Sequence, residues 1–365
     1  MTTEPTSSVT SALRTLLDQA IGRAGGWLPF DRYMALALYA PGLGYYSNGL
    51  RKFGALPSSG SDFITAPEMT PLFGQALAVQ VADALKATGT REVWEFGAGS
   101  GALAGQLLAA LGKRVGRYTI VDVSGELRAR QQQALAAHGE RVRWASEWPE
   151  RIEGVVVGNE VLDAMPVKLL ARSSGVWHER GVVLHEGALA FGDRPTQLRP
   201  PVEIAGNHDY LSEIHPQAEA FVRSLADRLH RGAAFFIDYG FGEDEYYHAQ
   251  RHMGTLMCHR GHLADTDPLA DPGAKDITAH VNFSGIALAA QEAGLATLGY
   301  TSQARFLMNC GIVPLLAAAP LAERVAGQRL LAEHEMGELF KVIGLHKGAF
   351  WDSVGFCEGD RTQRL

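Results

Sequence analysis

The sequence predicts an α/β fold: a parallel sheet with helices on both faces, preceded by a helical N-terminal part and interrupted by an inserted hairpin and loop region. Two observations predict it. From Glu92 onward, short apolar runs alternate with helical stretches, a pattern typical of βαβ units. A glycine-rich turn joins one of these runs to a helix, and acidic residues stand where other runs end.

The composition is that of a soluble globular protein, with 46% hydrophobic and 20% charged residues. The net charge is -7 and no dense Lys/Arg run occurs, which argues against a nucleic-acid partner because phosphate contacts need a basic face. The Ser/Thr-rich start lacks the apolar core of a signal peptide, and the most apolar stretch, 311–320, is too short to span a bilayer. We therefore expect a cytoplasmic protein without membrane insertion.

The cysteines and histidines do not predict a metal site. The three cysteines are far apart and include no C-x-x-C pair, so neither a zinc site nor a disulfide framework is indicated. Four histidines lie close together in one predicted loop: His248, His252, His259 and His262. Their spacing fits no recognised metal-binding motif, so we expect no metal.

The first 90 residues are predicted to form a helical and loop cap over the site. Apolar residues recur at helical spacing through 11–40, with a break at Gly25-Gly26. A loop rich in Gly, Pro and Ser follows from 41 to 67, which is long for a structureless connection and so indicates a functional loop. An apolar helix is predicted over 69–88.

Residues 91–365 are predicted to form the core, with insertions near 170–230 and 240–285. The first insertion contains alternating runs typical of a hairpin, and the second is rich in Gly, Asp and His with little periodicity. The predicted core strands are 93–96, 118–123, 142–145, 154–158, 233–237, 295–301 and 339–344. Helices are predicted within 97–111, 125–138, 286–293 and 302–335, and a further helix over 217–230.

The segment from Glu95 to Gly101, Glu-Phe-Gly-Ala-Gly-Ser-Gly, follows a predicted strand and opens a helix. Gly97, Gly99 and Gly101 let the backbone turn tightly and approach a ligand, and the helix start directs free N–H groups, with that of Ala98, toward it. Asp122, followed by Val123, ends the next strand, where a carboxylate can accept both hydroxyls of an adenosine ribose. A tight turn without a ligand is the alternative, which the pairing of glycines with this acid disfavours.

Two cofactors are compatible with the glycine loop and Asp122. Gly97, Gly99 and Ala102 satisfy G-x-G-x-x-A, which is compatible with NAD(P). Glu95 favours S-adenosylmethionine (SAM), because an acid can contact the methionine end whereas a pyrophosphate gains nothing from a neighbouring anion. The long segment before the glycine loop favours SAM as well, since dinucleotide-binding chains often begin with that loop.

A further acidic segment follows the strand 154–158. Asn159, Glu160 and Asp163 are expected at the carboxyl edge of the sheet, where open α/β sheets bind ligands. Two carboxylates there could hold a cationic nucleophile or take its proton, or they could merely begin a helix. Asp238, at the end of another predicted strand, is a second-rank candidate.

Together these motifs resemble the MidA-like methyltransferases, over roughly residues 28–346. The mitochondrial member of this family is the arginine methyltransferase needed for assembly of respiratory complex I. The matching blocks are Gly42 to Tyr46, Asp62 to Glu68, Phe73-Gly74, Glu95 to Gly101, Asn159-Glu160 with Asp163 to Val167, Asp238 to Gly240, Asp276 to Val281, and Met336 to Val342. Ser61 and Asn282 depart from the family pattern, which puts the substrate in doubt rather than the cofactor.

The resemblance implies a Rossmann-like class I methyltransferase fold with a helical N-terminal part that covers the site. It implies SAM as methyl donor and, by analogy with the mitochondrial member, symmetric dimethylation of an arginine on a protein partner, such as a complex I subunit. Gly97, Gly99 and Gly101 would then hold the methionine part and Asp122 the ribose. Asn159 and Glu160 would line the methyl-transfer site, and the block at Pro67-Glu68 would close over the cofactor.

An arginine side chain is always protonated in water, so a site must pair its guanidinium and direct one nitrogen at the methyl group. Glu160, Asp163 and Glu68 are the candidates for this catalytic role. Three alternatives stay open: a small-molecule O- or N-methyltransferase, a SAM-binding assembly factor without turnover, and, most distantly, an NAD(P) dehydrogenase.

Overall fold

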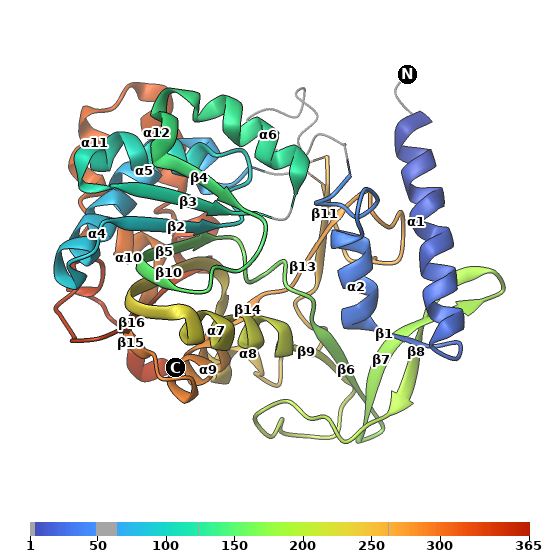
Figure 1. The fold of residues 1–365 in the computed structure, drawn as a ribbon. Coiled ribbons are helices and arrows are strands. Elements are labelled where there is room, and N and C mark those ends of the chain that lie inside the picture. Colours follow the sequence, from blue (N-terminus) through green and yellow to red (C-terminus); the bar gives the residue numbers. More distant parts are fainter. Residues whose placement is uncertain (1–3, 49–63, 123, 262) are drawn as a thin grey trace. The chain divides into compact units, whose positions relative to one another are not determined.

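The computed structural model describes residues 4–48, 64–122, 124–261 and 263–365 (Figure 1). The chain divides into two compact units. Unit 1 comprises Met1–Phe63, Asp163–Ala218 and Phe241–Asn282, and unit 2 comprises Ile64–Leu162, Glu219–Gly240 and Phe283–Leu365. Each unit is built from separate stretches of the chain, so most of its packing joins residues far apart in sequence.

Unit 2 contains a mixed sheet with the strand order β15-β16-β10-β5-β2-β3-β4. The strands β4, β3, β2, β5 and β10 are parallel, and β16 lies antiparallel between β10 and β15. The bounds are β2 Glu92–Phe96, β3 Arg117–Val121, β4 Val142–Ala145, β5 Ile152–Asn159, β10 Leu229–Phe241, β15 Ala296–Ser302 and β16 Phe340–Lys347. The predicted α/β class is thus confirmed, and each predicted core strand is present.

Helices cover both faces of this sheet (Figure 1). They are α3 Ala66–Met69, α4 Leu72–Thr88, α5 Ala102–Leu111, α6 Gly125–Ala134, α7 Pro216–Arg228, α9 Phe283–Glu292, α10 Gln303–Asn309, α11 Ile312–Ala318 and α12 Leu321–Arg329. Short 3-10 or π turns occupy Gly112–Arg114, Ala136–Arg141, Glu333–Gly337, Val354–Phe356 and Thr362–Arg364.

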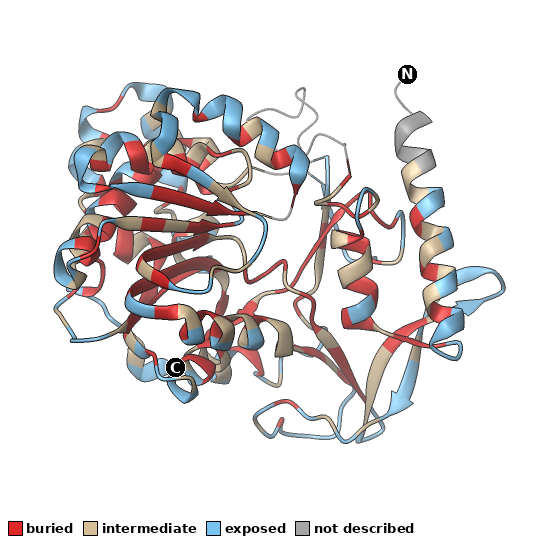
Figure 2. Ribbon diagram, viewed as in Figure 1, coloured by how far each residue is buried: buried red, intermediate tan, exposed pale blue. Residues whose placement is uncertain are grey.

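The two faces are filled differently. On one face, Phe73 and Leu77 of α4 pack with Val155 and Val157 of β5 in a large aliphatic core. On the other, Phe221 of α7 meets the rings of Phe96, Trp148 and Phe236, with centroids 5.0 to 5.8 Å apart. Figure 2 shows the buried residues following the central strands. Burial on both faces explains why these strands are continuous apolar runs in the sequence.

The helix predicted over 69–88 belongs to unit 2, as α3 and α4, which are separated at Thr70 and Pro71. The domain boundary predicted near residue 90 remains a prediction. In the structure, Ile64–Leu162 is one continuous stretch of unit 2, because α4 packs against α5 and β5.

Unit 1 is built on antiparallel sheets. Its strands are β1 Leu28–Pro29, β6 Lys168–Ser173, β7 Val176–His185, β8 Ala188–Pro195, β9 Tyr210–Ile214, β11 Met257–Arg260, β12 Leu263–Asp265, β13 Asp276–Thr278 and β14 Val281–Asn282; its helices are α1 Glu4–Arg23, α2 Phe30–Tyr39 and α8 Glu243–Tyr246. One sheet has the order β1-β7-β6-β9 with β8 on β7, so the predicted hairpin is present, and another has the order β12-β11-β13.

The helical region predicted over 11–40 is confirmed as α1 and α2. The break falls at Gly25 and Gly26, whose φ angles of 73° and 85° are in the left-handed region that favours glycine. Leu13, Leu17 and Phe30 from the two helices are fully buried and pack with Leu169 and Val182 of the sheet. This apolar core holds the N-terminal helices to strands that come more than a hundred residues later.

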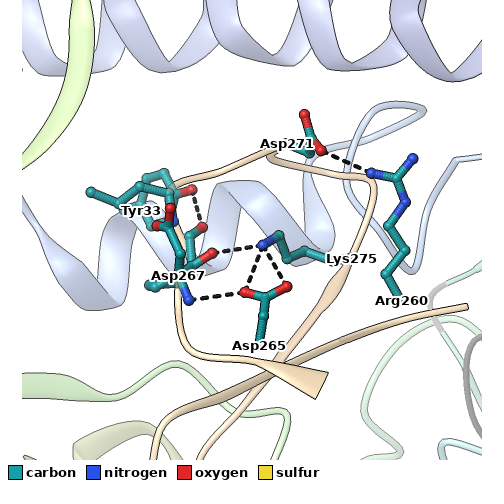
Figure 3. A network of polar contacts seen from close by, with 8 residues as sticks. Tyr33, Arg260, Asp265, Asp267, Asp271 and Lys275 are labelled. Atoms are coloured by element: carbon teal, nitrogen blue, oxygen red, sulfur yellow. Dashed lines mark hydrogen bonds and ion pairs between the residues drawn. The ribbon is translucent and has the colours of Figure 1, made fainter. Parts of the chain in front are cut away.

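Part of the aperiodic region between 240 and 285 is held by charged and polar contacts in addition to apolar packing. The Lys275 ammonium, only 4% exposed, donates to both carboxylate oxygens of Asp265 at 2.9 and 3.0 Å and to the Asp267 carbonyl at 2.7 Å (Figure 3). Tyr33 of α2 donates to the Pro268 carbonyl at 2.6 Å. These bonds act together with the apolar packing of Leu269 and Ile277 to hold this loop.

A second polar network in unit 1 surrounds Glu213 of β9, which is fully buried. One carboxylate oxygen accepts from the backbone N–H groups of Thr255 and Leu256 at 2.8 and 3.1 Å. The other accepts from the hydroxyls of Tyr246 and Thr255 at 3.0 and 3.1 Å. His215 lies 3.0 Å from the Tyr246 hydroxyl and is buried as well. Glu213 therefore ties β9 to α8 and to the segment before β11.

Candidate active site

The carboxyl ends of four neighbouring strands meet at one edge of the unit 2 sheet. Phe96 of β2 pairs with Val121 of β3 on one side and with Gly158 of β5 on the other. Asn159 of β5 in turn pairs with Ile237 of β10. The residues that follow each pairing are therefore neighbours, and they are the glycine loop, Asp122, Glu160 and Asp238.

The glycine loop has the geometry that its sequence predicts. Gly97, Gly99 and Gly101 have φ angles of 65°, 52° and 85°, all in the left-handed region. At Gly97 an added Cβ would also lie 3.1 Å from a methyl group of Val161. Gly101 donates to the Ala98 carbonyl at 2.8 Å and caps α5, whose first N–H groups lack helical partners. The loop thus offers backbone donors to a ligand.

Glu95 lies just before this loop, on β2, and is only 2% exposed. Within the described residues its carboxylate accepts one hydrogen bond, from the Tyr118 hydroxyl at 2.7 Å. Burial raises the pKa of Glu95 to about 7, against the Tyr118 bond that lowers it, and the charge of Asp122 adds to the rise. A buried carboxyl with one donor is suited to receive a cation, because an added positive charge would offset its desolvation.

Asp122 lies directly after β3 and is partly buried. One oxygen accepts from the Ser124 N–H at 2.9 Å and the other from the Gln131 amide at 2.8 Å. Burial raises the pKa of this carboxyl, and both hydrogen bonds oppose the rise. Each oxygen keeps a lone pair, so the carboxylate can still accept from a diol. Val123 lies outside the described residues.

The segment after β5 is held in an unusual conformation. Glu160 has a φ of 53°, which is strained for a residue with a Cβ, and its N–H donates to the Ile237 carbonyl at 2.9 Å. Its side chain accepts from the Asn159 amide at 3.0 Å. The buried Asp238 accepts from the N–H groups of Val161 and Leu162 at 3.1 and 2.9 Å, so it anchors this segment.

The two other predicted catalytic residues occupy different surroundings. Glu68 is in α3, where Gln106 of α5 donates to the Pro67 carbonyl at 2.7 Å and accepts from the Gly74 N–H at 3.0 Å. The helix that begins at the glycine loop therefore also fixes the Pro67-Glu68 block. Asp163 belongs to unit 1, is buried, and accepts at its carbonyl from the Ala279 N–H at 3.0 Å.

Three residues of this site were not predicted from the sequence: Tyr118, Gln131 and Trp144. Gln131 is the one polar member of a buried helical stripe with Leu127 and Leu135, spaced by four residues, and that spacing is a signal in the sequence. Tyr118 is two residues before Ile120, which pairs with Glu95, so it shares a face with the buried acid. Trp144 has no comparable sequence signal.

The arrangement fits SAM. Asn159 has a buried side-chain oxygen with no hydrogen-bond partner among the described residues, beside a loop of backbone donors. Glu95 and Asp122 supply carboxylates for an ammonium and a ribose. A pyrophosphate at the glycine loop, by contrast, would be repelled by the charge of Glu95. In the part of the chain that the structure describes, no three acidic, Cys or His side chains gather as metal ligands would. Among its helices, none has the length and apolar character to cross a bilayer.

A mixed sheet with this strand order, a glycine loop after one strand and a carboxylate after the next defines a class I SAM-dependent methyltransferase. Residues 76–301, more than half of the chain, match the family described as "Putative S-adenosyl-L-methionine-dependent methyltransferase". The chain belongs to this family, the MidA-like methyltransferases, which confirms the predicted resemblance.

A protein from Burkholderia thailandensis, solved in complex with S-adenosyl-homocysteine, is 50% identical to this chain. The match covers 100% of this chain and 99% of that one, with a TM-score of 0.95. Two further relatives are the mitochondrial protein arginine methyltransferase NDUFAF7 of Homo sapiens and its homolog in Caenorhabditis elegans. Each is 28% identical to this chain. The human match covers 83% of this chain, the nematode match covers 80%, and each covers 74% of the relative. SAM is therefore the cofactor, as predicted, and the NAD(P) alternative is excluded.

Proposed function

We propose that this methyltransferase transfers the methyl group of SAM to an arginine side chain of a protein, with Glu160 as the residue that binds the guanidinium. The observation that carries the proposal is the strained Glu160 backbone at the edge of β5, next to the glycine loop. Strain of about 1–3 kcal/mol persists only where the surroundings fix it, and it concentrates at functional sites. The mitochondrial relatives named as protein arginine methyltransferases support the same acceptor.

The charge of the site suits this acceptor. A guanidinium stays protonated at any physiological pH and forms its strongest hydrogen bonds with carboxylates. Glu160 has one carboxylate oxygen that accepts from Asn159, which orients the group, and Asp238 holds the following backbone in place. Glu68 is a further carboxylate that we assign to the acceptor, and the carbonyl of the preceding Pro67 accepts from Gln106 of α5. The catalytic role of Asp163 stays a prediction.

In the proposed mechanism, bound SAM supplies an electrophilic methyl group on its sulfonium. Gly97, Gly99 and Gly101 bind the methionine part and Asp122 binds the ribose hydroxyls. Glu160 accepts N–H hydrogen bonds from the guanidinium, which concentrates the positive charge on the paired nitrogens and leaves the remaining one as nucleophile. The S–CH3 bond breaks with its electron pair left on the sulfur of S-adenosyl-homocysteine, and the methylated nitrogen gives one proton to the Glu160 carboxylate, from which it passes to water. The rate comes chiefly from positioning for this in-line displacement.

The test is methyl transfer by Glu160→Gln, which keeps the size and the hydrogen-bond acceptor but removes the charge. We expect loss of turnover of at least a hundredfold with SAM affinity within a few-fold of the wild type. Glu160→Gly is the matched control, since glycine relieves the φ strain: it should lose turnover too while gaining stability. Loss of SAM affinity in Glu160→Gln equal to its loss of turnover would make Glu160 a cofactor residue and contradict the proposal.

The acceptor is tested separately. A lysate from the source organism, lacking its own copy of the protein, is incubated with the enzyme and methyl-labelled SAM. Acid hydrolysis of the labelled protein should release methylated arginine, and symmetric dimethylarginine would match the family analogy. Label confined to small molecules would support the alternative of a small-molecule methyltransferase. No label with any acceptor, despite SAM binding, would support an assembly factor without turnover.

A further inference from the structure

One glutamine connects the two halves of the cofactor site. Gln131 of α6 is fully buried, whereas the adjacent Gln132 and Gln133 are exposed. Its amide nitrogen donates to the Gly99 carbonyl at 3.0 Å and to the Asp122 carboxylate at 2.8 Å. An amide nitrogen carries two N–H donors, so both are used, one on each half of the site.

The orientation of the Gln131 amide is fixed by a third hydrogen bond, to its oxygen. Its oxygen accepts from the indole N–H of Trp144 at 3.0 Å. Because an indole N–H can only donate, the amide oxygen must face Trp144 and the amide nitrogen must face Gly99 and Asp122. Trp144 stands at the end of β4, so the central sheet itself determines which way Gln131 points.

The two acceptors determine how a ligand is received. In a planar trans peptide the N–H points opposite to the carbonyl, so the bond from Gln131 to the Gly99 carbonyl turns the Ser100 N–H away from α6. The bond to Asp122 uses one lone pair of one carboxylate oxygen, on the side of α6, and the remaining lone pairs can accept from the ribose hydroxyls. The Gln131 side chain thus orients both the Ser100 N–H of the glycine loop and the Asp122 carboxylate after the next strand.

We propose that Gln131 is a positioning residue for SAM, which holds the glycine loop and the Asp122 carboxylate in the arrangement that binds the methionine and ribose parts at once. This proposal rests on the assignment of the loop and Asp122 to the cofactor. It does not depend on the identity of the methyl acceptor, so the proposed arginine specificity can fail without affecting it.

The experiment measures the dissociation constant of S-adenosyl-homocysteine by calorimetry, together with thermal unfolding without ligand. Gln131→Met keeps the volume but has no N–H donor, and Gln131→Glu keeps the shape but places a carboxyl against Asp122. We expect the first to weaken binding about tenfold and the second at least fiftyfold. The same substitutions at Gln132, an exposed glutamine on the same helix, are the matched controls and should change binding less than twofold.

Three further measurements separate positioning from a merely structural role. Adding Gln131→Met to Asp122→Ala should weaken binding less than Gln131→Met does in the wild type, because the part of its effect that passes through Asp122 is already lost. On acidification, the loss of affinity that comes from protonation of Asp122 should begin at a higher pH in Gln131→Met than in the wild type, because the Gln131 bond lowers the pKa of Asp122. Trp144→Phe, which removes only the indole N–H contact, should weaken binding several-fold.

Methylthioadenosine, which keeps the ribose but lacks the amino-acid end, distinguishes the two contacts. Gln131→Met should lose more affinity for S-adenosyl-homocysteine than for methylthioadenosine, since only the former uses the glycine loop fully. Equal losses would overturn the part of the proposal that concerns Gly99. Wild-type affinity in Gln131→Met would overturn the whole proposal. Wild-type affinity in Asp122→Ala would instead remove its premise, the assignment of Asp122 to the cofactor.

Discussion

Two buried glutamates, one in each unit, are satisfied very differently. Glu213 in unit 1 accepts four hydrogen bonds, two from backbone N–H groups and two from hydroxyls. Glu95 in unit 2 accepts one within the described residues, from Tyr118, and burial raises its pKa to about 7. Each acid is almost fully shielded from solvent, so the number of donors and not the burial separates them.

The difference indicates what each acid is for. A carboxylate that receives four donors has its charge dispersed and serves to join segments of the fold. A carboxylate with one donor is costly in the free protein, and a ligand that brings positive charge removes that cost. Glu95 is therefore an acid whose partner we expect to be the ammonium of SAM, and Glu213 is an acid whose partners are already in the protein.

The largest effect should come from Glu213→Ala. It removes the acceptor of four hydrogen bonds, two of them from backbone N–H groups, and we expect a loss of about 4 kcal/mol in the free energy of unfolding, measured with urea. Glu203→Ala, at an exposed glutamate of the same unit, is the control and should change stability by less than about 0.5 kcal/mol. A loss below about 1 kcal/mol for Glu213→Ala would show that its four bonds are not what holds unit 1 together.

The next largest effect should be the pH dependence of stability that comes from His215, which lies in the same network. Burial lowers its pKa to about 3, with a further contribution from His280, while the unfolded chain has the ordinary value of 6.5. The unfolded state binds more protons between these values, so the stability due to His215 is present above pH 6.5 and is lost as the pH falls toward 3. The difference in free energy of unfolding between the wild type and His215→Gln should therefore shrink as the pH falls from 7 to 4.

The control for this pH series is His185→Gln, at an exposed histidine of β7, which should leave the pH dependence of stability unchanged. A constant deficit of His215→Gln at every pH would contradict the assignment, because it would mean that His215 contributes through packing and not through its neutral state.

Glu95→Gln should have opposite effects on stability and on binding. The folded state holds the proton of Glu95 more tightly than the unfolded chain does, so its contribution to stability falls as the pH rises from 4.5 to 7. At pH 8, Glu95→Gln should therefore stabilise the free protein by about 2 kcal/mol and weaken SAM binding about tenfold, with little change of stability at pH 5. Thermal unfolding and calorimetry at the two pH values measure both.

Glu92→Gln is the matched control, since Glu92 lies on the same strand but is partly exposed and paired with Arg117. It should leave SAM affinity within twofold of the wild type. If Glu95→Gln weakened binding without stabilising the free protein, the carboxylate would not be under the desolvation that its burial implies.

The smallest effect should come from Tyr118→Phe. Loss of the hydroxyl donor should raise the pKa of Glu95 above about 7, so a smaller fraction is ionised at neutral pH. SAM affinity should fall several-fold at pH 7 and recover by pH 9, whereas in the wild type it should rise from pH 6 to pH 8. A Tyr118→Phe variant with the wild-type pH profile would show that this bond does not tune Glu95.

The strands of the unit 2 sheet could be predicted from sequence because each is a short apolar run that ends in a recognisable turn or acid, as at Glu95 to Gly101 and at Asp122. The supporting residues could not be predicted so readily. Gln131 stands in a run of three glutamines, and only its helical phase with Leu127 and Leu135 distinguishes it. The divided course of unit 1 could not be predicted either, because its segments are joined by apolar packing between residues far apart in sequence, such as Leu13 and Leu169, and no local pattern specifies such partners.

The place of β16 has a consequence for the growing chain. Phe340–Lys347 inserts between β10 and β15, so a polypeptide still on the ribosome carries both of those strands with an open hydrogen-bonding edge until residue 347 has been made. Exposed apolar edges such as that of β10 invite pairing with other chains. Nascent or prematurely stopped chains should therefore aggregate readily, and synthesis of this protein should depend on chaperones until residue 347 has emerged.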